Sequence, residues 1–172
     1  EGLRGVVICT KDALTGLCDL GGWKIEAFAG ETLSKTAVFA RNLSLTGLEF
    51  AHGIPGTVGG GIYMNAGAYG GEMKQVAMET TVLTMDGETR VFAGEAQGFA
   101  YRTSAFESFP AIIVKTVFQL APGDKEEISA RMQELMEKRR VSQPLELPSA
   151  GSTFKRPEGA YAGALIQGAN LK

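Results

Sequence analysis

The sequence has few residues that could bind a metal or form cross-links. Its 172 residues include two cysteines, Cys9 and Cys18, and one histidine, His52. The cysteines lack the paired Cys/His spacing of a zinc site, and two cysteines do not make a disulfide framework. We therefore expect no metal site and two reduced, partly buried thiols. No base or nucleophile is spaced around His52, so we expect that residue to be structural.

Long apolar runs and an excess of one charge are also missing. Lys and Arg number 17 and Asp and Glu 19, which gives a formal net charge of −2 at pH 7. This balance argues against nucleic acid or an anionic membrane surface as the main partner. No unbroken apolar run is long enough to span a bilayer. We also find no charged segment followed by an apolar one, the pattern of a secretory leader. We expect a cytoplasmic protein without membrane insertion, whose 44% apolar residues form a core.

Alternating and β-branched residues predict strands in the first part of the chain. The run GVVICT, residues 5–10, predicts a buried strand. Further on, Trp23, Ile25 and Ala27 alternate with charged residues, which predicts a second strand with these three side chains on one face. From Thr32 to Arg41 the apolar spacing becomes helical, and Thr32 or Glu31 can cap the start of a helix.

The second half of the chain carries stronger local signals. Residues 82–92, VLTMDGETRVF, predict a hairpin with a two-residue turn at Asp86-Gly87. Residues 111–120, AIIVKTVFQL, predict another strand, and residues 123–140 predict a helix with a capping box and one apolar stripe. Such a mixture of helices, strands and a hairpin favours the α+β class. Three prolines within residues 141–157 then indicate extended chain that leads to another unit.

Residues 53–72, GIPGTVGGGIYMNAGAYGGE, contain almost no side chain able to do acid, base or nucleophilic chemistry. Because glycine has no Cβ, its peptide groups can approach a ligand closely. We expect residues 56–60 to offer consecutive N–H groups to a phosphate or to the polar edge of a flat heteroaromatic ring. Neither common nucleotide-binding glycine pattern is present. Residue chemistry leaves open the alternative that the segment is a tight loop whose glycines serve packing.

Three stretches occur in a recognisable order. They are the glycine-rich segment at Gly53, YRTSAF at Tyr101 and SAGSTFKRP at Ser149. Their order and spacing resemble the UDP-N-acetylenolpyruvoylglucosamine reductases, a family of flavoenzymes. The resemblance covers nearly the whole chain, including RRVSQP before the last stretch and GALIQGANLK after it.

The resemblance implies an enzyme that binds FAD and uses NADPH to reduce UDP-N-acetylglucosamine enolpyruvate to UDP-N-acetylmuramate in peptidoglycan precursor synthesis. It implies that residues 1–141 are the second lobe of a PCMH-type FAD-binding region, with a mostly antiparallel sheet flanked by helices. Residues 142–172 would begin an α+β substrate-binding domain. The family's first lobe and a final stretch with a catalytic glutamate would lie outside the chain, so the 172 residues alone are expected to be inactive. The residues indicate no oligomeric state.

The resemblance also assigns roles to individual residues. In the family, flavin N5 delivers hydride to the β-carbon of the enolpyruvyl group. Arg102 would stabilise the substrate carboxylate and enolate, for which a guanidinium fork is well shaped, and Ser152 would protonate the α-carbon. Substrate contacts are expected from Tyr101, Arg140, Lys155 and Arg156. Cofactor contacts are expected from Gly53, Ile54, Pro55, Gly56, Thr57, Gly59, Gly60, Asn65, Gly67 and Ala68.

Residue chemistry alone favours a structural interpretation of three of these side chains over a functional one. Arg102 would pair with a surface acid, Ser152 would be a loop or capping serine, and Arg140 would complement a helix dipole. Two other functions also stay open at this point. One is an FAD-dependent oxidase of a small alcohol or hydroxy acid, and the other is a non-catalytic domain whose glycine loop serves packing or partner binding.

Overall fold

The computed structural model describes every residue except 1, 3, 144, 148–153, 158 and 172. The chain divides into two compact units, residues 1–139 and 140–172. The second unit contains the end of helix α3 (Lys125–Ser142) and a short helix, α4 (Ala162–Gly168). Within the described residues, no helix is both long and apolar enough to cross a membrane.

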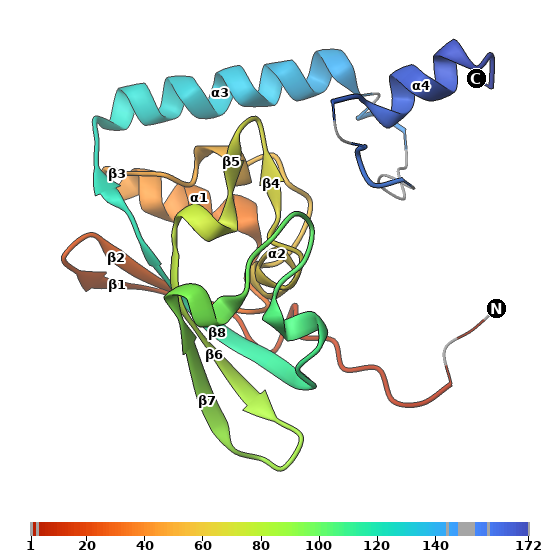
Figure 1. The fold of residues 1–172 in the computed structure, drawn as a ribbon. Helices are drawn as coiled ribbons and strands as arrows, with labels where there is room; N and C mark the ends of the chain where they lie inside the picture. Colours follow the sequence, from red (N-terminus) through yellow and green to blue (C-terminus); the bar gives the residue numbers. More distant parts are fainter. Residues whose placement is uncertain (1, 3, 144, 148–153, 158, 172) are drawn as a thin grey trace. The chain divides into compact units, whose positions relative to one another are not determined.

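The first unit is built on a five-stranded sheet in the order β1-β2-β8-β6-β7, in which every neighbouring pair is antiparallel (Figure 1). The strands are β1 (Leu17–Gly21), β2 (Lys24–Phe28), β6 (Ala77–Thr84), β7 (Thr89–Ala93) and β8 (Ala111–Gln119). Two small ladders accompany the sheet. They pair β3 (Leu45–Thr46) with β9 (Ala121–Pro122), and β4 (Gly67–Ala68) with β5 (Gly71–Glu72). The predicted α+β class with a mostly antiparallel sheet is confirmed.

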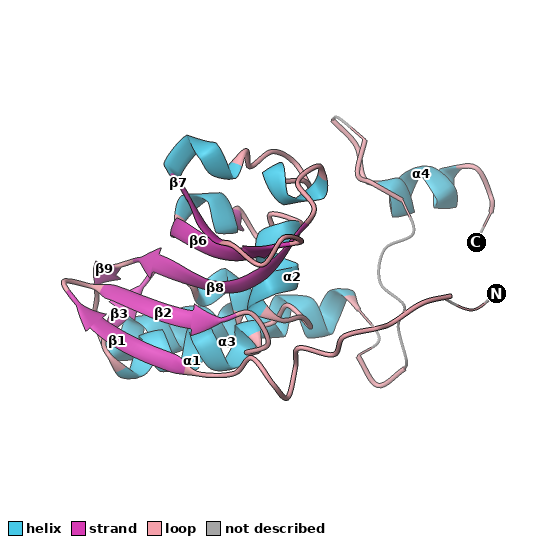
Figure 2. Ribbon diagram, turned by 90° about the horizontal axis from the view of Figure 1, so that it is seen from below, coloured by secondary structure: helices cyan, strands magenta, loops and turns pink. Residues whose placement is uncertain are grey.

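The core lies between the sheet and two helices, α1 (Leu33–Asn42) and α2 (Val58–Tyr63) (Figure 2). Helix α2 packs on the central strands β2 and β8, and α1 packs on α2. Alternation along β2 buries Ile25 and Ala27 completely, next to the fully buried Phe118 of β8. Four short 3₁₀ turns connect these elements: η1 (Glu49–Ala51), η2 (Met73–Gln75), η3 (Gly94–Gln97) and η4 (Ala105–Glu107).

The two predicted helices begin where their capping residues indicate. The Thr32 side chain accepts a hydrogen bond from the Lys35 amide at 3.2 Å and so caps α1. The Asp124 carboxylate accepts one from the Glu127 amide at 2.9 Å at the start of α3. The apolar stripe of α3 packs into the hydrophobic core of the first unit through Ile128, Met132 and Leu135, as the spacing predicts.

Several strand predictions need correction. Residues 5–10 form no strand, and Val6 is 92% exposed, because the described residues offer no neighbouring strand to pair with this β-branched run. Trp23 lies in the β1–β2 turn at φ 62° and is exposed, so only Ile25 and Ala27 point inward as predicted. Both cysteines are exposed, contrary to the expectation of partial burial.

The hairpin at Asp86-Gly87 exists, but its loop is longer than predicted. The Thr84 amide bonds to the Glu88 carbonyl at 2.9 Å, which leaves three residues between them. Gly87 has φ 85° and donates to the Thr84 carbonyl at 3.0 Å, the arrangement of a turn followed by a left-handed residue. The Thr84 hydroxyl donates to the Asp86 carboxylate and lowers the pKa of that carboxyl.

Candidate functional site

The glycine-rich segment runs from the end of η1 through α2 to β5. Thr57 caps α2, and its side chain accepts from the Gly60 amide at 3.4 Å. The next amides bond to the loop that follows β2: Val58 donates to the Glu31 carbonyl at 2.8 Å, and Gly59 to the Ala29 carbonyl at 2.9 Å. The expectation of five consecutive free N–H groups is therefore wrong for residues 58–60, because the protein itself uses those donors.

Several glycines of the segment are required by packing. A Cβ on Gly71 would lie 2.4 Å from a Phe50 ring carbon, and one on Gly67 would lie 2.6 Å from the Gly71 carbonyl oxygen. On α2, a Cβ on Gly59 would lie 3.0 Å from the Ala29 methyl, and one on Gly61 would lie 3.1 Å from Leu33. At these four positions the interpretation as a tight, close-packed loop is correct.

Gly71→Ala is therefore expected to destabilise the fold by about 1–3 kcal/mol, the usual range for overpacking a filled site. For a domain of this size that corresponds to a melting temperature lower by several degrees. Gly56→Ala is the matched control, because no heavy atom lies within 4 Å of the added methyl group. Thermal unfolding of the two apo-proteins measures the difference. Equal melting temperatures would show that the Phe50 contact does not require glycine.

A second group of glycines faces open space. No heavy atom lies within 4 Å of a Cβ built on Gly56, and the nearest to one on Gly60 is the Thr57 hydroxyl oxygen at 3.6 Å. Both glycines are exposed. The hydrogen bonds of the described residues include none from the amides of Gly56 or Thr57. This stretch, with the exposed Pro55 before it, is where a flat ligand could lie directly on the backbone.

The loop at residues 100–104 is tied to the glycine-rich segment by hydrogen bonds from three side chains. Asn65 Nδ2 donates to the Ala100 carbonyl at 3.0 Å, and Arg102 Nη2 donates to the Gly67 carbonyl at 3.0 Å. The Ser104 hydroxyl donates to the Tyr63 carbonyl at 2.7 Å. We call this set of bonds the clasp. It brings two of the three recognised stretches together in space.

Arg102 lies at the centre of the clasp. Its backbone has φ 56°, a left-handed conformation that costs a non-glycine residue about 1 kcal/mol or more. Its guanidinium carbon lies 5.5 Å from the centroid of the Tyr101 ring, and Tyr101 is 53% exposed. The bond to Gly67 uses one of the five N–H donors of the guanidinium, so enough remain to hold a carboxylate through two bonds.

Asn65, an expected cofactor contact, is buried and bonded within the protein. The residue is 1% exposed, and its amide nitrogen also donates to Glu72 Oε2 at 3.0 Å. Its side-chain oxygen accepts from the Lys74 amide at 2.9 Å, and its own backbone amide donates to the Ile62 carbonyl at 3.2 Å. The protein itself therefore uses both N–H donors and the oxygen of this side chain, and a cofactor contact of Asn65 stays a prediction.

Arg139 is a residue that the sequence reasoning missed. A Cβ built on Gly53 would lie 3.2 Å from Arg139 Nε, so this arginine borders the start of the glycine-rich segment. Helical spacing could have identified it, because Arg139 continues the stripe of Met132 and Leu135, seven and four residues before it. Nearby, His52 Nδ1 lies 3.3 Å from the Ser34 hydroxyl oxygen, a contact that suits the structural role expected of this histidine.

Three of the predicted substrate contacts, Arg140, Lys155 and Arg156, belong to the second unit. Arg140 and Lys155 are exposed, and so is Arg156. Arg156 Nε donates to the Ala160 carbonyl at 3.2 Å, and its guanidinium lies 3.9 Å from the Tyr161 ring centroid. Ser152 lies outside the described residues. The residues Ile54 and Ala68 are half-buried within the glycine-rich segment.

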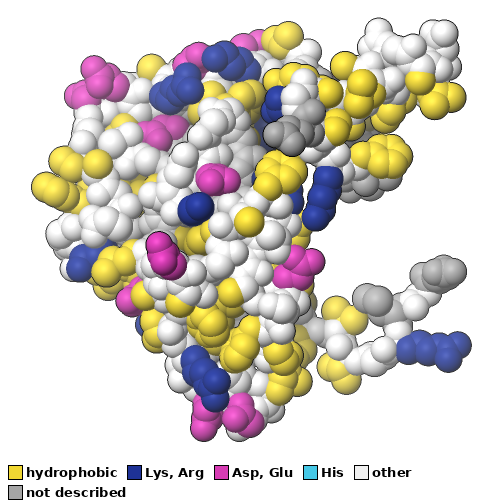
Figure 3. Space-filling model, in the orientation of Figure 1, with side chains coloured by type: hydrophobic (Ala, Val, Ile, Leu, Met, Phe, Trp, Pro, Cys, Tyr) yellow, Lys and Arg dark blue, Asp and Glu magenta, His cyan; other side chains and the backbone are white. Residues whose placement is uncertain are grey.

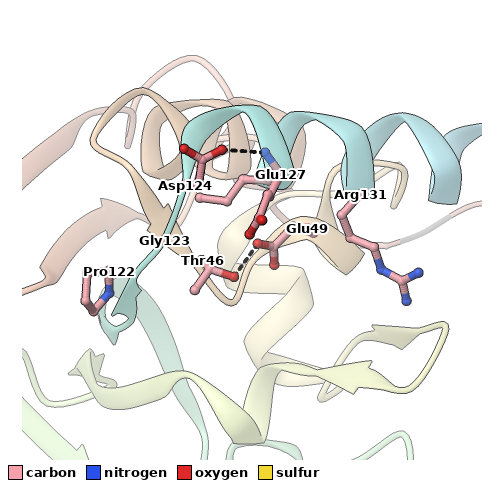
Figure 4. Close-up of a pocket in the computed structure, with 8 residues that line it drawn as sticks. Thr46, Glu49, Pro122, Gly123, Asp124, Glu127 and Arg131 are labelled. Carbon is pink, nitrogen blue, oxygen red and sulfur yellow. Dashed lines mark hydrogen bonds between the residues drawn. The ribbon is translucent and has the colours of Figure 1, made fainter.

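A hollow of about 480 Å³ lies apart from the clasp, beneath the start of α3 (Figure 4). Of the acidic side chains that line it, Glu49 and Asp124 have hydrogen-bond partners. Glu49 accepts from the Thr46 hydroxyl at 2.6 Å and the Gly47 amide at 2.9 Å, and Asp124 caps α3. Among the described residues, no three His, Cys, Asp or Glu side chains gather closely enough to hold a metal ion. We therefore place the candidate site at the glycine-rich segment.

Charge does not single out another site on the face shown in Figure 3. There, acidic and basic side chains are interspersed, and the described residues of this face form no broad field of one sign. Positive charge reaches the candidate site from Arg102, held at the Gly67 carbonyl, and from Arg139, which borders Gly53.

The chain matches a known protein family and is similar to reductases from two bacteria. The sequence profile of a family described as FAD binding domain matches residues 2–93. UDP-N-acetylenolpyruvoylglucosamine reductase of Streptococcus uberis is 48% identical over 171 residues, which are 99% of this chain and 56% of that protein. The reductase of the same name from Limosilactobacillus reuteri is 50% identical over 149 residues, 87% of this chain and 50% of that protein.

A solved structure is also similar. The crystal structure of UDP-N-acetylenolpyruvylglucosamine reductase from Thermus caldophilus matches with a TM-score of 0.75 and 39% sequence identity. The match covers 84% of this chain and 53% of that one. The chain thus spans about half the length of the curated relatives that it matches.

Proposed function

The chain belongs to the FAD-binding domain family, and from that premise we propose that it is part of a reductase of UDP-N-acetylglucosamine enolpyruvate. In this proposal NADPH is the reductant and UDP-N-acetylmuramate, a peptidoglycan precursor, is the product, formed in the cytoplasm. Residues 1–141 belong to the FAD-binding region and residues 142–172 begin the substrate-binding domain. The observation that carries the proposal is the bond from Arg102 to the Gly67 carbonyl, which puts a cation against the glycine-rich segment.

The glycine-rich segment fits a flat cofactor at one face. Gly56 and Gly60 are exposed, and the nearest heavy atom to a Cβ built on either is the Thr57 hydroxyl oxygen, 3.6 Å from that on Gly60. The N–H groups of Gly56 and Thr57 are available to the polar edge of such a ring. Packing explains the glycines at positions 59, 61, 67 and 71, which hold this face in place.

FAD, when bound, supplies the hydride that the β-carbon of the enolpyruvyl group receives. The chain's own residues stabilise the negative charge and donate the proton. As hydride adds, negative charge develops on the substrate carboxylate and α-carbon, and Arg102 stabilises it through its fork of donors. Ser152 gives its hydroxyl proton to the α-carbon. One hydride and one proton together convert the enol ether into the saturated lactyl ether.

The remaining contacts follow the chemistry of the substrate. Its diphosphate is anionic, and Arg140, Lys155 and Arg156 of the second unit are exposed cations suited to it. In this proposal Tyr101, which is exposed and adjoins Arg102, contacts the enolpyruvyl group.

Half-reactions of the intact protein that contains this chain test the proposal. We expect the purified protein to be yellow, to lose its flavin absorbance when NADPH is added without oxygen, and to regain it with UDP-N-acetylglucosamine enolpyruvate. Reoxidation by dioxygen but not by the enolpyruvyl compound would favour an oxidase instead. A colourless protein that releases no flavin on denaturation would indicate a non-catalytic domain.

A further inference from the structure

We infer that Asn65 positions Arg102 for catalysis and does not bind the cofactor. The inference rests on the proposed function and adds a residue role to it. Asn65 and Arg102 are 37 positions apart in the sequence, yet both belong to the clasp. The loop that presents Arg102 is fixed on one side by the Asn65 side chain and on the other by the Ser104 hydroxyl.

The hydrogen-bond capacity of Asn65 supports this role. A carboxamide has two N–H donors, and both are used, one by the Ala100 carbonyl and one by Glu72 Oε2. The backbone of Asn65 has φ 42°, a region that asparagine tolerates better than most residues. Asparagine therefore satisfies the conformation and both bonds at one buried position.

The bond to Ala100 acts on Arg102 through the intervening backbone. Ala100 is two residues before Arg102, and Ala100 and Thr103 exchange backbone hydrogen bonds at 3.1 and 3.3 Å that close a tight turn. Arg102 itself is in the left-handed region, so its conformation is maintained by its surroundings. Without the Asn65 bond, the turn loses its anchor on that side and the guanidinium shifts from the Gly67 carbonyl.

Asn65→Asp tests the inference, because aspartate is isosteric and also tolerates positive φ, but offers no N–H donor. We expect flavin content and flavin reduction by NADPH to stay within about twofold of wild type. Reoxidation by the enolpyruvyl substrate should slow about 10- to 100-fold, since misplacing a catalytic group by about 1 Å can have that effect. Loss of flavin or slowed reduction, with reoxidation intact, would indicate cofactor contact and overturn the inference.

A second substitution separates positioning from stability. When Asn65→Asp is combined with Glu72→Gln, the introduced glutamine amide can donate to the introduced aspartate and restore that bond in reverse, while the Ala100 bond stays broken. We expect the melting temperature to recover but not the reoxidation rate; recovery of both would mean that Asn65 acts only through stability. If Asn65→Asp does not fold, Asn65→Gly removes the same bond at the same φ and carries the same expectation.

A structural readout separates this inference from the proposed function. In a crystal structure of the Asn65→Asp protein, we expect the distance from Arg102 Nη2 to the Gly67 carbonyl to exceed hydrogen-bonding range. An unchanged distance would overturn the inference whatever the substrate is. Failure of the wild-type protein to reduce the enolpyruvyl compound would instead refute the proposed function and leave the crystallographic result to decide the role of Asn65.

Discussion

Replacing Ser152 with alanine is expected to slow reoxidation of the reduced enzyme by substrate about 10²- to 10⁴-fold, the range that a general acid contributes. Flavin reduction by NADPH should be unchanged, because no proton reaches the substrate in that half-reaction. A serine hydroxyl is a weak acid in water, so this role requires a nearby cation, and Lys155 of the same stretch is the candidate. Stopped-flow absorbance of the flavin measures the two half-reactions separately.

The control for Ser152→Ala is Ser129→Ala, which removes a hydroxyl from the exposed side of α3, where it donates to the Lys125 carbonyl. That variant should leave both half-reactions unchanged. Ser152→Cys retains a proton donor and should recover part of the lost rate. Equal slowing of both half-reactions in Ser152→Ala would remove the serine from the proton-transfer step.

Local signals predicted most of the secondary structure. Thr32 and Asp124 cap their helices as the sequence suggests, because a capping bond joins residues only three positions apart. The strand at residues 111–120 was also predicted, since its apolar content suits the central position of β8. Such features depend on neighbours in the sequence and can be read without the fold.

The errors arose where distant residues decide the outcome. The run at residues 5–10 has strand composition, but a strand also needs a partner, and the described residues provide none. β1, which was missed, pairs with β2 although it contains Asp19 and Gly21 at an exposed sheet edge. Composition indicates whether a segment favours the β conformation, whereas pairing with a neighbouring strand decides whether it forms a strand.

At the candidate site, too, some features could be predicted from the sequence and others depend on distant residues. The resemblance predicted the glycine-rich segment and Arg102 as site residues, but it did not show which glycines face open space and which pack against the protein. The Phe50 ring explains why residue 71 is glycine, because it leaves no room for a Cβ. At Gly56 no neighbouring atom excludes a side chain. The bond from Asn65 to Ala100 was also hidden, since Ala100 is 35 residues away and accepts through its backbone carbonyl. A backbone carbonyl leaves no signal in a sequence.

Arg102→Lys is expected to lower the rate of substrate reduction about 10- to 100-fold, which corresponds to losing a charged hydrogen bond of about 1.5–3 kcal/mol. Both side chains are cationic and unbranched at Cβ, so the cost of φ 56° is the same in the two proteins. The substitution therefore changes only the head group. An ammonium is a compact charge that cannot bond to the Gly67 carbonyl and also hold both oxygens of a carboxylate in the arginine geometry.

Arg131→Lys is the matched control, because Arg131 pairs with Glu134 on the exposed surface of α3, where lysine can pair equally well. This control should turn over at the wild-type rate. In Arg102→Lys, flavin reduction by NADPH should also be unchanged, so the defect should be confined to the substrate half-reaction. Wild-type turnover in Arg102→Lys would show that charge alone suffices and that the clasp does not present a bidentate carboxylate site. A defect in flavin reduction instead would place Arg102 at the cofactor, and its bond to Gly67 would then serve to shape the flavin face of the segment.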